Sequence, residues 1–183
     1  MSEVAAVLNK ARGLDKKYMT FKRRKLYIAC EHFDFSWYSH EILAVRELWK
    51  NMISITTIAK MLGRHLNELV FLIIDQSPKY MKHRQGKITN DVSSFEHMFN
   101  QDPVNFDEEK YHACERYNFI WDEQEVYKLR HLWKSGASIF YISEMFKRNV
   151  NEVAFLIVDQ ADQGYIKARK GGVLGEFFES KCD

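Results

Sequence analysis

Cysteine and histidine side chains lie close together at two places in the chain, and this pairing could serve metal chemistry. Cys30 with His32, and His112 with Cys114, each offer two ligands of a kind that zinc takes. Neither place has the CxxC or HxxxH spacing of common zinc sites. Because Ala-Cys-Glu occurs at both places, we interpret the cysteines as buried structural residues and expect no metal site.

Two Asp-Gln pairs, Asp75-Gln76 and Asp159-Gln160, could in principle serve acid–base catalysis. No nucleophile is tied to either pair, and such residues at a helix end more often form local hydrogen bonds. The chain also lacks the GxxxxGK[ST] phosphate loop, the GxSxG elbow and the HExxH zinc motif. We therefore expect no catalytic residues and no cofactor, and we predict that the protein is not an enzyme.

The Ala-Cys-Glu and Asp-Gln strings occur twice because the chain contains an internal duplication. Residues 35–76 align without a gap on residues 119–160, with 19 of the 42 positions identical. The match extends outward to two repeats of about 60 residues, 27–86 and 111–171. Two copies are too few for a solenoid, which leaves tandem small domains or a pseudo-twofold pair sharing one core. The other predicted segments are a basic arm (1–26), an acidic linker (87–110) and a C-terminal tail (172–183).

Composition narrows the class of protein. The longest apolar runs are shorter than the 18 residues that a membrane helix needs, and the N-terminus lacks the apolar stretch of a secretory signal. Three scattered cysteines do not form a disulfide scaffold. We expect a reduced, cytoplasmic protein that makes no use of a membrane.

Charge is distributed unevenly along the chain, although its net value is only +2. Residues 1–26 hold eight Lys or Arg against two acids (8 − 2 = +6), whereas residues 88–125 hold two against ten (2 − 10 = −8). A basic arm suits an anionic partner, but it is also common in solvated helices and tails.

Each repeat has the periodicity of a short helical domain. Ile42, Val45 and Trp49 follow an i, i+3, i+7 pattern, which predicts a first helix with one apolar face, and the second repeat matches it. Ser54 stands where a second helix needs an N-cap, and Gly63 suits its left-handed C-cap. We therefore predict a mainly α fold with three helices in each repeat. The aromatic segments that begin at Tyr27 and Tyr111 are expected to line the core or to form short leading strands.

A known domain type matches this pattern. Trp37, Glu41 and Trp49 give the string W-x3-E-x7-W, which is followed by Ser54 and by Ile-Ala-x-x-Leu-Gly-Arg. The repeats resemble the trihelical Myb/SANT-like fold, and especially the GcrA-type and resolvase-like helix-turn-helix domains. The resemblance implies two duplicated trihelical helix-turn-helix domains, with room for short β wing segments, in a transcription regulator that binds double-stranded DNA.

In such domains the N-terminal end of the third helix reads base edges in the major groove. The matching candidates are His65 and Asn67 in repeat 1 and Asn149 and Asn151 in repeat 2, because an Asn amide can pair with adenine through two hydrogen bonds. The basic residues nearby are predicted to contact phosphates: Arg64, Lys82, Arg84, Arg148, Lys167, Arg169 and Lys170, with Arg23 and Arg24 in the arm. Repeat 1, which has the arm and the glycine turn, is expected to make the stronger DNA contact.

The third helices also permit another function. Residues 69–74 and 153–158 are each six apolar residues in a row, whereas a lone groove-reading helix buries only one stripe. These helices must pack on the other repeat, on a second subunit or on a foreign protein. The alternative is therefore a protein-interaction adaptor that binds RNA polymerase, a replication factor or a host protein, as a phage or mobile element would encode.

Overall fold

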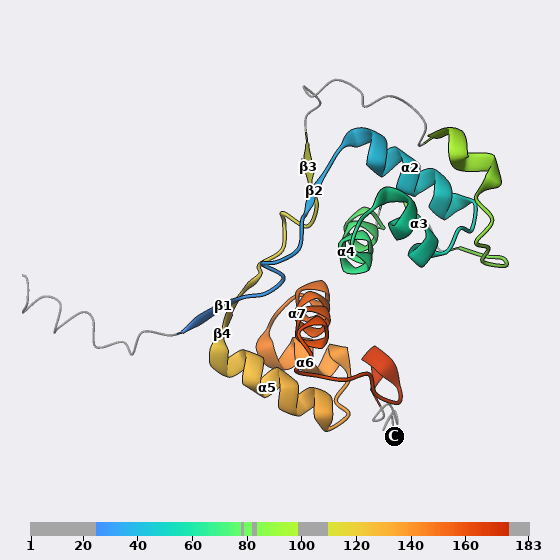
Figure 1. The fold of residues 1–183 in the computed structure, drawn as a ribbon. Coiled ribbons are helices and arrows are strands. Elements are labelled where there is room, and N and C mark those ends of the chain that lie inside the picture. Colours follow the sequence, from blue (N-terminus) through green and yellow to red (C-terminus); the bar gives the residue numbers. More distant parts are fainter. Residues whose placement is uncertain (1–24, 78, 82–83, 99–109, 176–183) are drawn as a thin grey trace, which may run out of the picture.

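The computed structural model describes residues 25–77, 79–81, 84–98 and 110–175. Its α-helices are α2 (Ser39–Lys50), α3 (Ile55–Leu62) and α4 (Leu66–Gln76) in repeat 1, and α5 (Glu123–Lys134), α6 (Ile139–Phe146) and α7 (Val150–Asp162) in repeat 2 (Figure 1). Two 3-10 turns, η1 (Ser93–Met98) and η2 (Gly172–Leu174), follow the two sets of helices. The expectation of a mainly α fold is confirmed. No helix of the described part is long and apolar enough to cross a membrane.

Local hydrogen bonds set the boundaries of the second helices. The Ser54 hydroxyl accepts from the Thr57 amide at 3.2 Å, and the Ser138 hydroxyl accepts from the Tyr141 amide at 3.1 Å. Both helices end on a left-handed residue, Gly63 at φ 63° and Lys147 at φ 54°. Lys147 therefore adopts the same turn as Gly63, although a side chain makes that conformation less favourable by about 1–2 kcal/mol.

Short strands connect the two repeats. β1 (Leu26–Ile28) pairs antiparallel with β4 (Ile120–Asp122), and β2 (Ser36–Trp37) pairs antiparallel with β3 (Tyr111–His112). Each strand of one repeat therefore pairs only with the other repeat. We refer to residues 26–37 and 111–122 as the leading segments. In the described residues the strands precede the first helix of each repeat, which agrees with the expectation of short leading strands. No strand among these residues forms a wing after a third helix.

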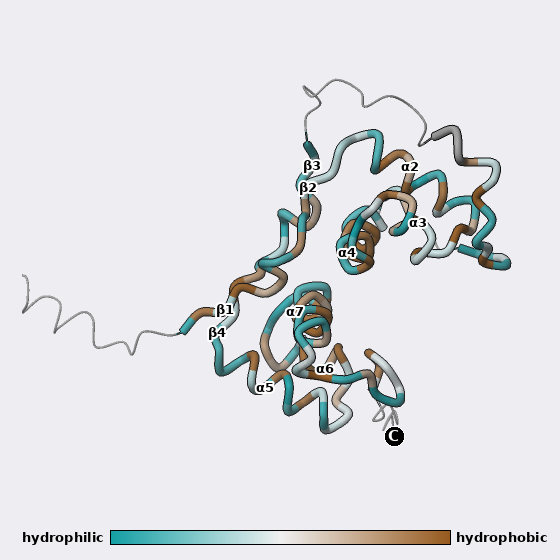
Figure 2. Tube along the Cα trace, viewed as in Figure 1, coloured by the Kyte–Doolittle hydropathy of each residue, from teal (hydrophilic) through white to brown (hydrophobic). Residues whose placement is uncertain are grey.

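The two repeats share one core, as in the pseudo-twofold arrangement. Buried side chains of both repeats form a single cluster. At its centre the rings of Phe71 and Phe155 meet edge to face, with centroids 5.2 Å apart. Phe35 stacks on Phe71 at 5.6 Å, and Phe119 stacks on Phe155 at 5.4 Å. The apolar residues of α4 and α7 lie at the middle of the molecule (Figure 2).

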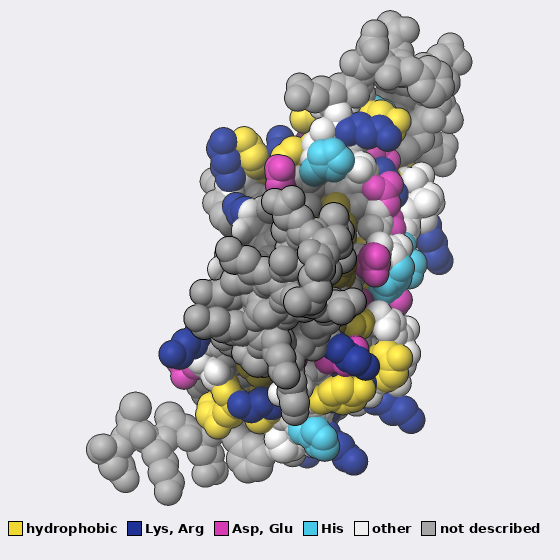
Figure 3. Space-filling model, turned by 90° about the vertical axis from the view of Figure 1, so that its left-hand side faces the viewer, with side chains coloured by type: hydrophobic (Ala, Val, Ile, Leu, Met, Phe, Trp, Pro, Cys, Tyr) yellow, Lys and Arg dark blue, Asp and Glu magenta, His cyan; other side chains and the backbone are white. Residues whose placement is uncertain are grey.

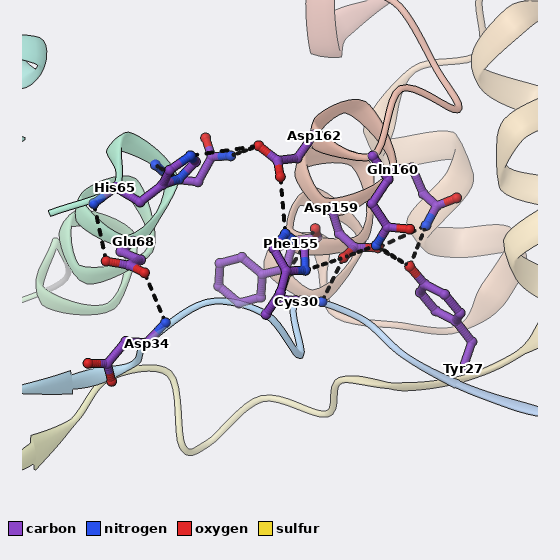
Figure 4. A network of polar contacts seen from close by, with 12 residues as sticks. Tyr27, Cys30, Asp34, His65, Glu68, Phe155, Asp159, Gln160 and Asp162 are labelled. Carbon is purple, nitrogen blue, oxygen red and sulfur yellow. Dashed lines mark hydrogen bonds and ion pairs between the residues drawn. The ribbon is translucent and has the colours of Figure 1, made fainter.

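Polar contacts fix the leading segments on the opposite repeat. The Tyr27 hydroxyl donates to Asp159 Oδ2 at 2.6 Å, and the Cys30 amide donates to Asp159 Oδ1 at 2.9 Å (Figure 4). The Tyr111 hydroxyl donates to Asp75 in the same way. Each leading segment thus docks on the third helix of the other repeat. The recurring Asp of the Asp-Gln pairs has this structural role.

Replacing Asp159 with alanine tests the docking. The change leaves the Tyr27 hydroxyl and the Cys30 amide without their acceptor, so the free energy of unfolding should fall by about 2–4 kcal/mol in urea titration. Glu144→Ala, an exposed acid on α6, is the control and should change stability by less than about 0.5 kcal/mol. Equal effects of the two changes would contradict the docking.

The tyrosines of the leading segments make stability depend on pH. Burial, together with the hydrogen bond to a carboxylate, raises the pKa of Tyr27 and of Tyr111 to about 12. The folded state therefore holds these protons more tightly than the unfolded state, in which tyrosine ionises near pH 10. The resulting stability is fully present below about pH 10 and is lost as the pH rises towards about 12.

The free energy of unfolding, measured by urea titration between pH 8 and 12, should decline over that window. A variant with both tyrosines changed to phenylalanine removes the two titrating groups and should show a smaller decline. The same decline in wild type and variant would show that other groups cause it.

Candidate nucleic-acid interface

The residues predicted to read bases lie at the N-terminal ends of α4 and α7, which we refer to as the helix tips. His65 and Asn149 are the N-caps, and both are exposed. His65 Nδ1 accepts from the Asn67 amide at 3.3 Å, and Asn149 Oδ1 accepts from the Asn151 amide at 2.8 Å. One polar atom of each cap is therefore occupied by its own helix, and His65 Nε2 also lies 4.0 Å from Asp162 Oδ1.

Asn67 and Asn151 are half-buried and hydrogen-bonded through their side chains. Asn67 Nδ2 donates to Asp162 Oδ1 at 2.9 Å, and Asn151 Nδ2 donates to the Tyr117 hydroxyl at 2.7 Å. To pair with adenine, each amide would have to exchange its present acceptor for the base. The exposed caps therefore make better candidates for base contact than these two residues.

Arg64 is held inside repeat 1. Its guanidinium lies over the Trp37 ring at 4.4 Å, binds Glu41 Oε2 at 2.9 Å and Asp34 Oδ2 at 3.0 Å, and donates to the Ser36 carbonyl at 2.8 Å. Its side chain is 14% exposed. A phosphate contact would require Arg64 to give up these bonds.

Arg148 occupies the matching place in repeat 2. Its guanidinium lies over the Trp121 ring at 4.2 Å, donates to the Ile120 carbonyl and reaches Glu152 Oε2 at 3.5 Å. The Arg and the first Trp of each repeat thus recur as a stacked pair. The sequence showed both residue types but gave no sign that they meet.

Arg84 and Arg169 fasten the chain that follows each third helix. Arg84 stacks over Trp49 at 3.8 Å and Arg169 over Trp133 at 3.7 Å. Arg84 donates to the Ile53 carbonyl at 2.6 Å, and Arg169 donates to the carbonyls of Trp133 and Ala137. These arginines therefore carry structural contacts that the sequence did not reveal.

The remaining predicted phosphate contacts differ in where they lie. Lys167 and Lys170 are exposed on the segment after α7. Arg23, Arg24 and Lys82 lie outside the described residues. On the face drawn in Figure 3, the described Lys and Arg side chains lie at separate places, with acidic and histidine side chains between them. On that face, no continuous basic surface forms among the described residues.

The third helices lie side by side and run in opposite directions. The tip of α4 meets the end of α7 through the bond between Asn67 and Asp162. At the other end, Arg116 donates to the Asp75 carbonyl at 3.1 Å, and its neighbour Tyr117 holds Asn151. From Asn151 to Asp162 is eleven steps along α7, so the two tips lie roughly 17 Å apart. Within α4 only Leu66 is largely exposed.

A cleft opens on the outer side of each repeat, between the first helix and the chain after the third helix. In repeat 2 it has a volume of about 450 Å³ and is lined by residues 130–134 and 164–169, apart from Leu132. In repeat 1 the matching cleft is about 520 Å³. Arg130 stacks on Tyr165 at 3.8 Å, and Arg46 stacks on Tyr80 at 3.7 Å. Reasoning from sequence missed both clefts, because the first helix was expected only to support the fold.

Comparison with protein-family models, with curated proteins and with solved structures finds no match for this chain. Its function must therefore be argued from its own residues.

Replacing Arg64 with alanine separates a structural role from a phosphate contact. The change leaves the half-buried Glu41 carboxylate without its cation, so the free energy of unfolding should fall by about 2–3 kcal/mol in urea titration. Lys60→Ala, an exposed change on α3, is the control and should leave stability nearly unaltered. A variant as stable as wild type would return Arg64 to the candidate phosphate contacts.

Proposed function

We propose that the protein binds double-stranded DNA and regulates transcription, using two helix-turn-helix repeats joined as one body. The observation that carries the proposal is the repeated α3–turn–α4 and α6–turn–α7 geometry. Each unit has a serine-capped second helix, a left-handed turn and a polar N-cap that opens the third helix. This order of elements is similar to the helix-turn-helix pattern. It supports a fold-level analogy, and function must be tested at the tips.

The packing of the third helices determines how such a protein could meet DNA. Paired helix-turn-helix units usually place their recognition helices about 34 Å apart, in successive major grooves. Here the tips are roughly 17 Å apart, and the faces of α4 and α7 beyond the tips are largely covered. We therefore propose that the two tips form one composite DNA-binding surface, which we call the composite reader. A single stretch of DNA contacts both tips, or contacts one tip through its bases and the surrounding protein through its phosphates.

His65 and Asn149 are the residues that we assign to base contact. Both are exposed at a helix N-terminus, where unpaired backbone amides also attract phosphate oxygens. The carboxylates of Glu68 and Glu152 do not have to face DNA phosphates, because both accept backbone hydrogen bonds. Glu68 accepts from the amides of His65 and Asp34, and Glu152 accepts from the amide of Asn118.

Selection from a random duplex pool, repeated at several salt concentrations, tests this function. We expect enrichment of one contiguous element, with affinity that falls steeply as salt rises. Two half-sites one helical turn apart would contradict the composite reader. Absence of binding at low salt would overturn the DNA-binding function.

The variant Asn149→Ser sharpens the same experiment. Serine keeps the helix cap but removes the amide, so the fold should survive while discrimination at one base position weakens by about 1–3 kcal/mol. Ser54 caps α3 by the same kind of bond and is only half-buried, so Ser54→Asn, which keeps a capping side chain, serves as the control. An unchanged enriched sequence with Asn149→Ser would remove Asn149 from the base contacts.

A specific surface favours the second function, a protein-interaction adaptor. Tyr127, Phe140 and Tyr141 are exposed on α5 and α6 by 58%, 46% and 51%. Thr56 and Thr57 stand at the positions of repeat 1 that match Phe140 and Tyr141. Exposed aromatic side chains are typical anchors of protein interfaces. A protein that fails to bind any duplex in the selection would direct the search to this face.

A further inference from the structure

The cleft of repeat 2 has the charge of an anion-binding site. Its lining carries four basic side chains and, among the described residues, no acidic one. The basic side chains are Arg130, Lys134, Lys167 and Arg169. Its volume of about 450 Å³ lies within the range of small-ligand sites, roughly 300–1,000 Å³.

Both walls of the cleft are fixed before any ligand arrives. The Trp133 indole is 7% exposed, and its Nε1 donates to the Lys167 carbonyl at 2.9 Å. Arg169 joins the same segment to α5 through its bond to the Trp133 carbonyl. The backbone that carries Lys167 is therefore held against the helix that carries Lys134. A preformed site avoids part of the ordering cost of binding.

Arg130 is oriented in the cleft but not saturated. Its guanidinium lies over the Tyr165 ring, 3.8 Å from the ring centroid, and its Nε donates to Gln160 Oε1 at 2.6 Å. Within the described part of the chain this is its one hydrogen bond, so four of its five N–H groups are open to a ligand. A guanidinium presents such groups as a planar fork that suits two phosphate oxygens.

We propose that this cleft binds one or two phosphodiester groups of duplex DNA, with Arg130, Lys134 and Lys167 as the contacts. The assignment rests on the proposed DNA-binding function and gives it a specific phosphate site outside the helix tips. Arg169 holds the wall, since its hydrogen bonds go to carbonyl groups of the chain.

The matching cleft of repeat 1 has a different charge. Glu47 stands there at the position of His131, beside Arg46, Lys50 and Arg84. A carboxylate in the lining repels a phosphate, whereas a histidine side chain carries no negative charge. The charges of the two clefts therefore favour repeat 2 for the stronger contact with DNA phosphates. The sequence had instead favoured repeat 1 for the stronger DNA contact.

The experiment is a titration of the full chain with a 20-bp duplex between 50 and 300 mM salt, followed by fluorescence anisotropy. The double variant Lys134→Ala with Lys167→Ala loses two exposed cations, so the slope of log affinity against log salt should become shallower by about 1.8. Lys50→Ala, the match of Lys134 in repeat 1, should leave the slope close to that of wild type.

A charge swap gives a second measurement. His131→Glu introduces the residue of repeat 1 at an exposed position of α5, and it should weaken duplex binding about tenfold at 50 mM salt. Because an acid in the last turn of α5 opposes the helix dipole, the thermal unfolding midpoint should fall, but only by about a few degrees. Glu47→Gln should strengthen binding less than twofold, because we assign no phosphate to that cleft.

The outcomes separate the two proposals. Wild type that binds the duplex, with unchanged slope and affinity in the cleft variants, overturns the cleft assignment and leaves the DNA-binding function standing. Wild type that does not bind the duplex at 50 mM salt overturns the DNA-binding function and the cleft assignment together. A slope change of about 0.9 for Lys50→Ala, the same per cation as in the double variant, would contradict the preference for repeat 2.

Discussion

Two buried aspartates, Asp75 and Asp159, hold the architecture together. Each lies near the end of a third helix and accepts from a tyrosine hydroxyl of the opposite leading segment. A carboxylate removed from water needs such hydrogen-bond partners. The exchange of the leading segments between repeats therefore provides donors for the two aspartates and also covers the apolar core. The packing of Phe71 on Phe155 lies between these two contacts. The duplicated chain is therefore one cooperative body.

This constraint changes what the two proposed helix-turn-helix units could do. Two independent modules on a tether would gain affinity through effective concentration and could reach separate half-sites. In this protein the third helices are joined along their apolar faces, so the spacing between the tips is fixed by helix length and not by a linker. The proposed DNA site is therefore short and composite, and the outer faces of the first and second helices remain for other contacts.

The repeats share their scaffold and differ at their surfaces. The Arg on Trp pairs, the serine caps and the left-handed turns occur twice with nearly the same geometry. Outside that scaffold, Glu47 is matched by His131 and Thr57 by Tyr141. The interface between the repeats differs too. His32 and Arg116 occupy matching positions, but His32 Nε2 lies 3.1 Å from Asp162 Oδ2, whereas Arg116 binds Asp75. Such differences in charge and aromatic content give the outer surfaces of the two repeats different chemical character.

The sequence by itself determined the duplication, the helices and their ends. These features depend on identity, on apolar periodicity and on caps such as Ser54, which act within a few residues and can be recognised without a fold. Only the tertiary structure decided what the recurring polar residues contact. Arg64 suits a phosphate or a tryptophan ring equally well by residue type, and its burial over Trp37 results from the packing of two helices. The exchange of the leading segments was equally hidden, because strand pairing between repeats joins residues more than 70 positions apart, and local pattern carries no information about that choice.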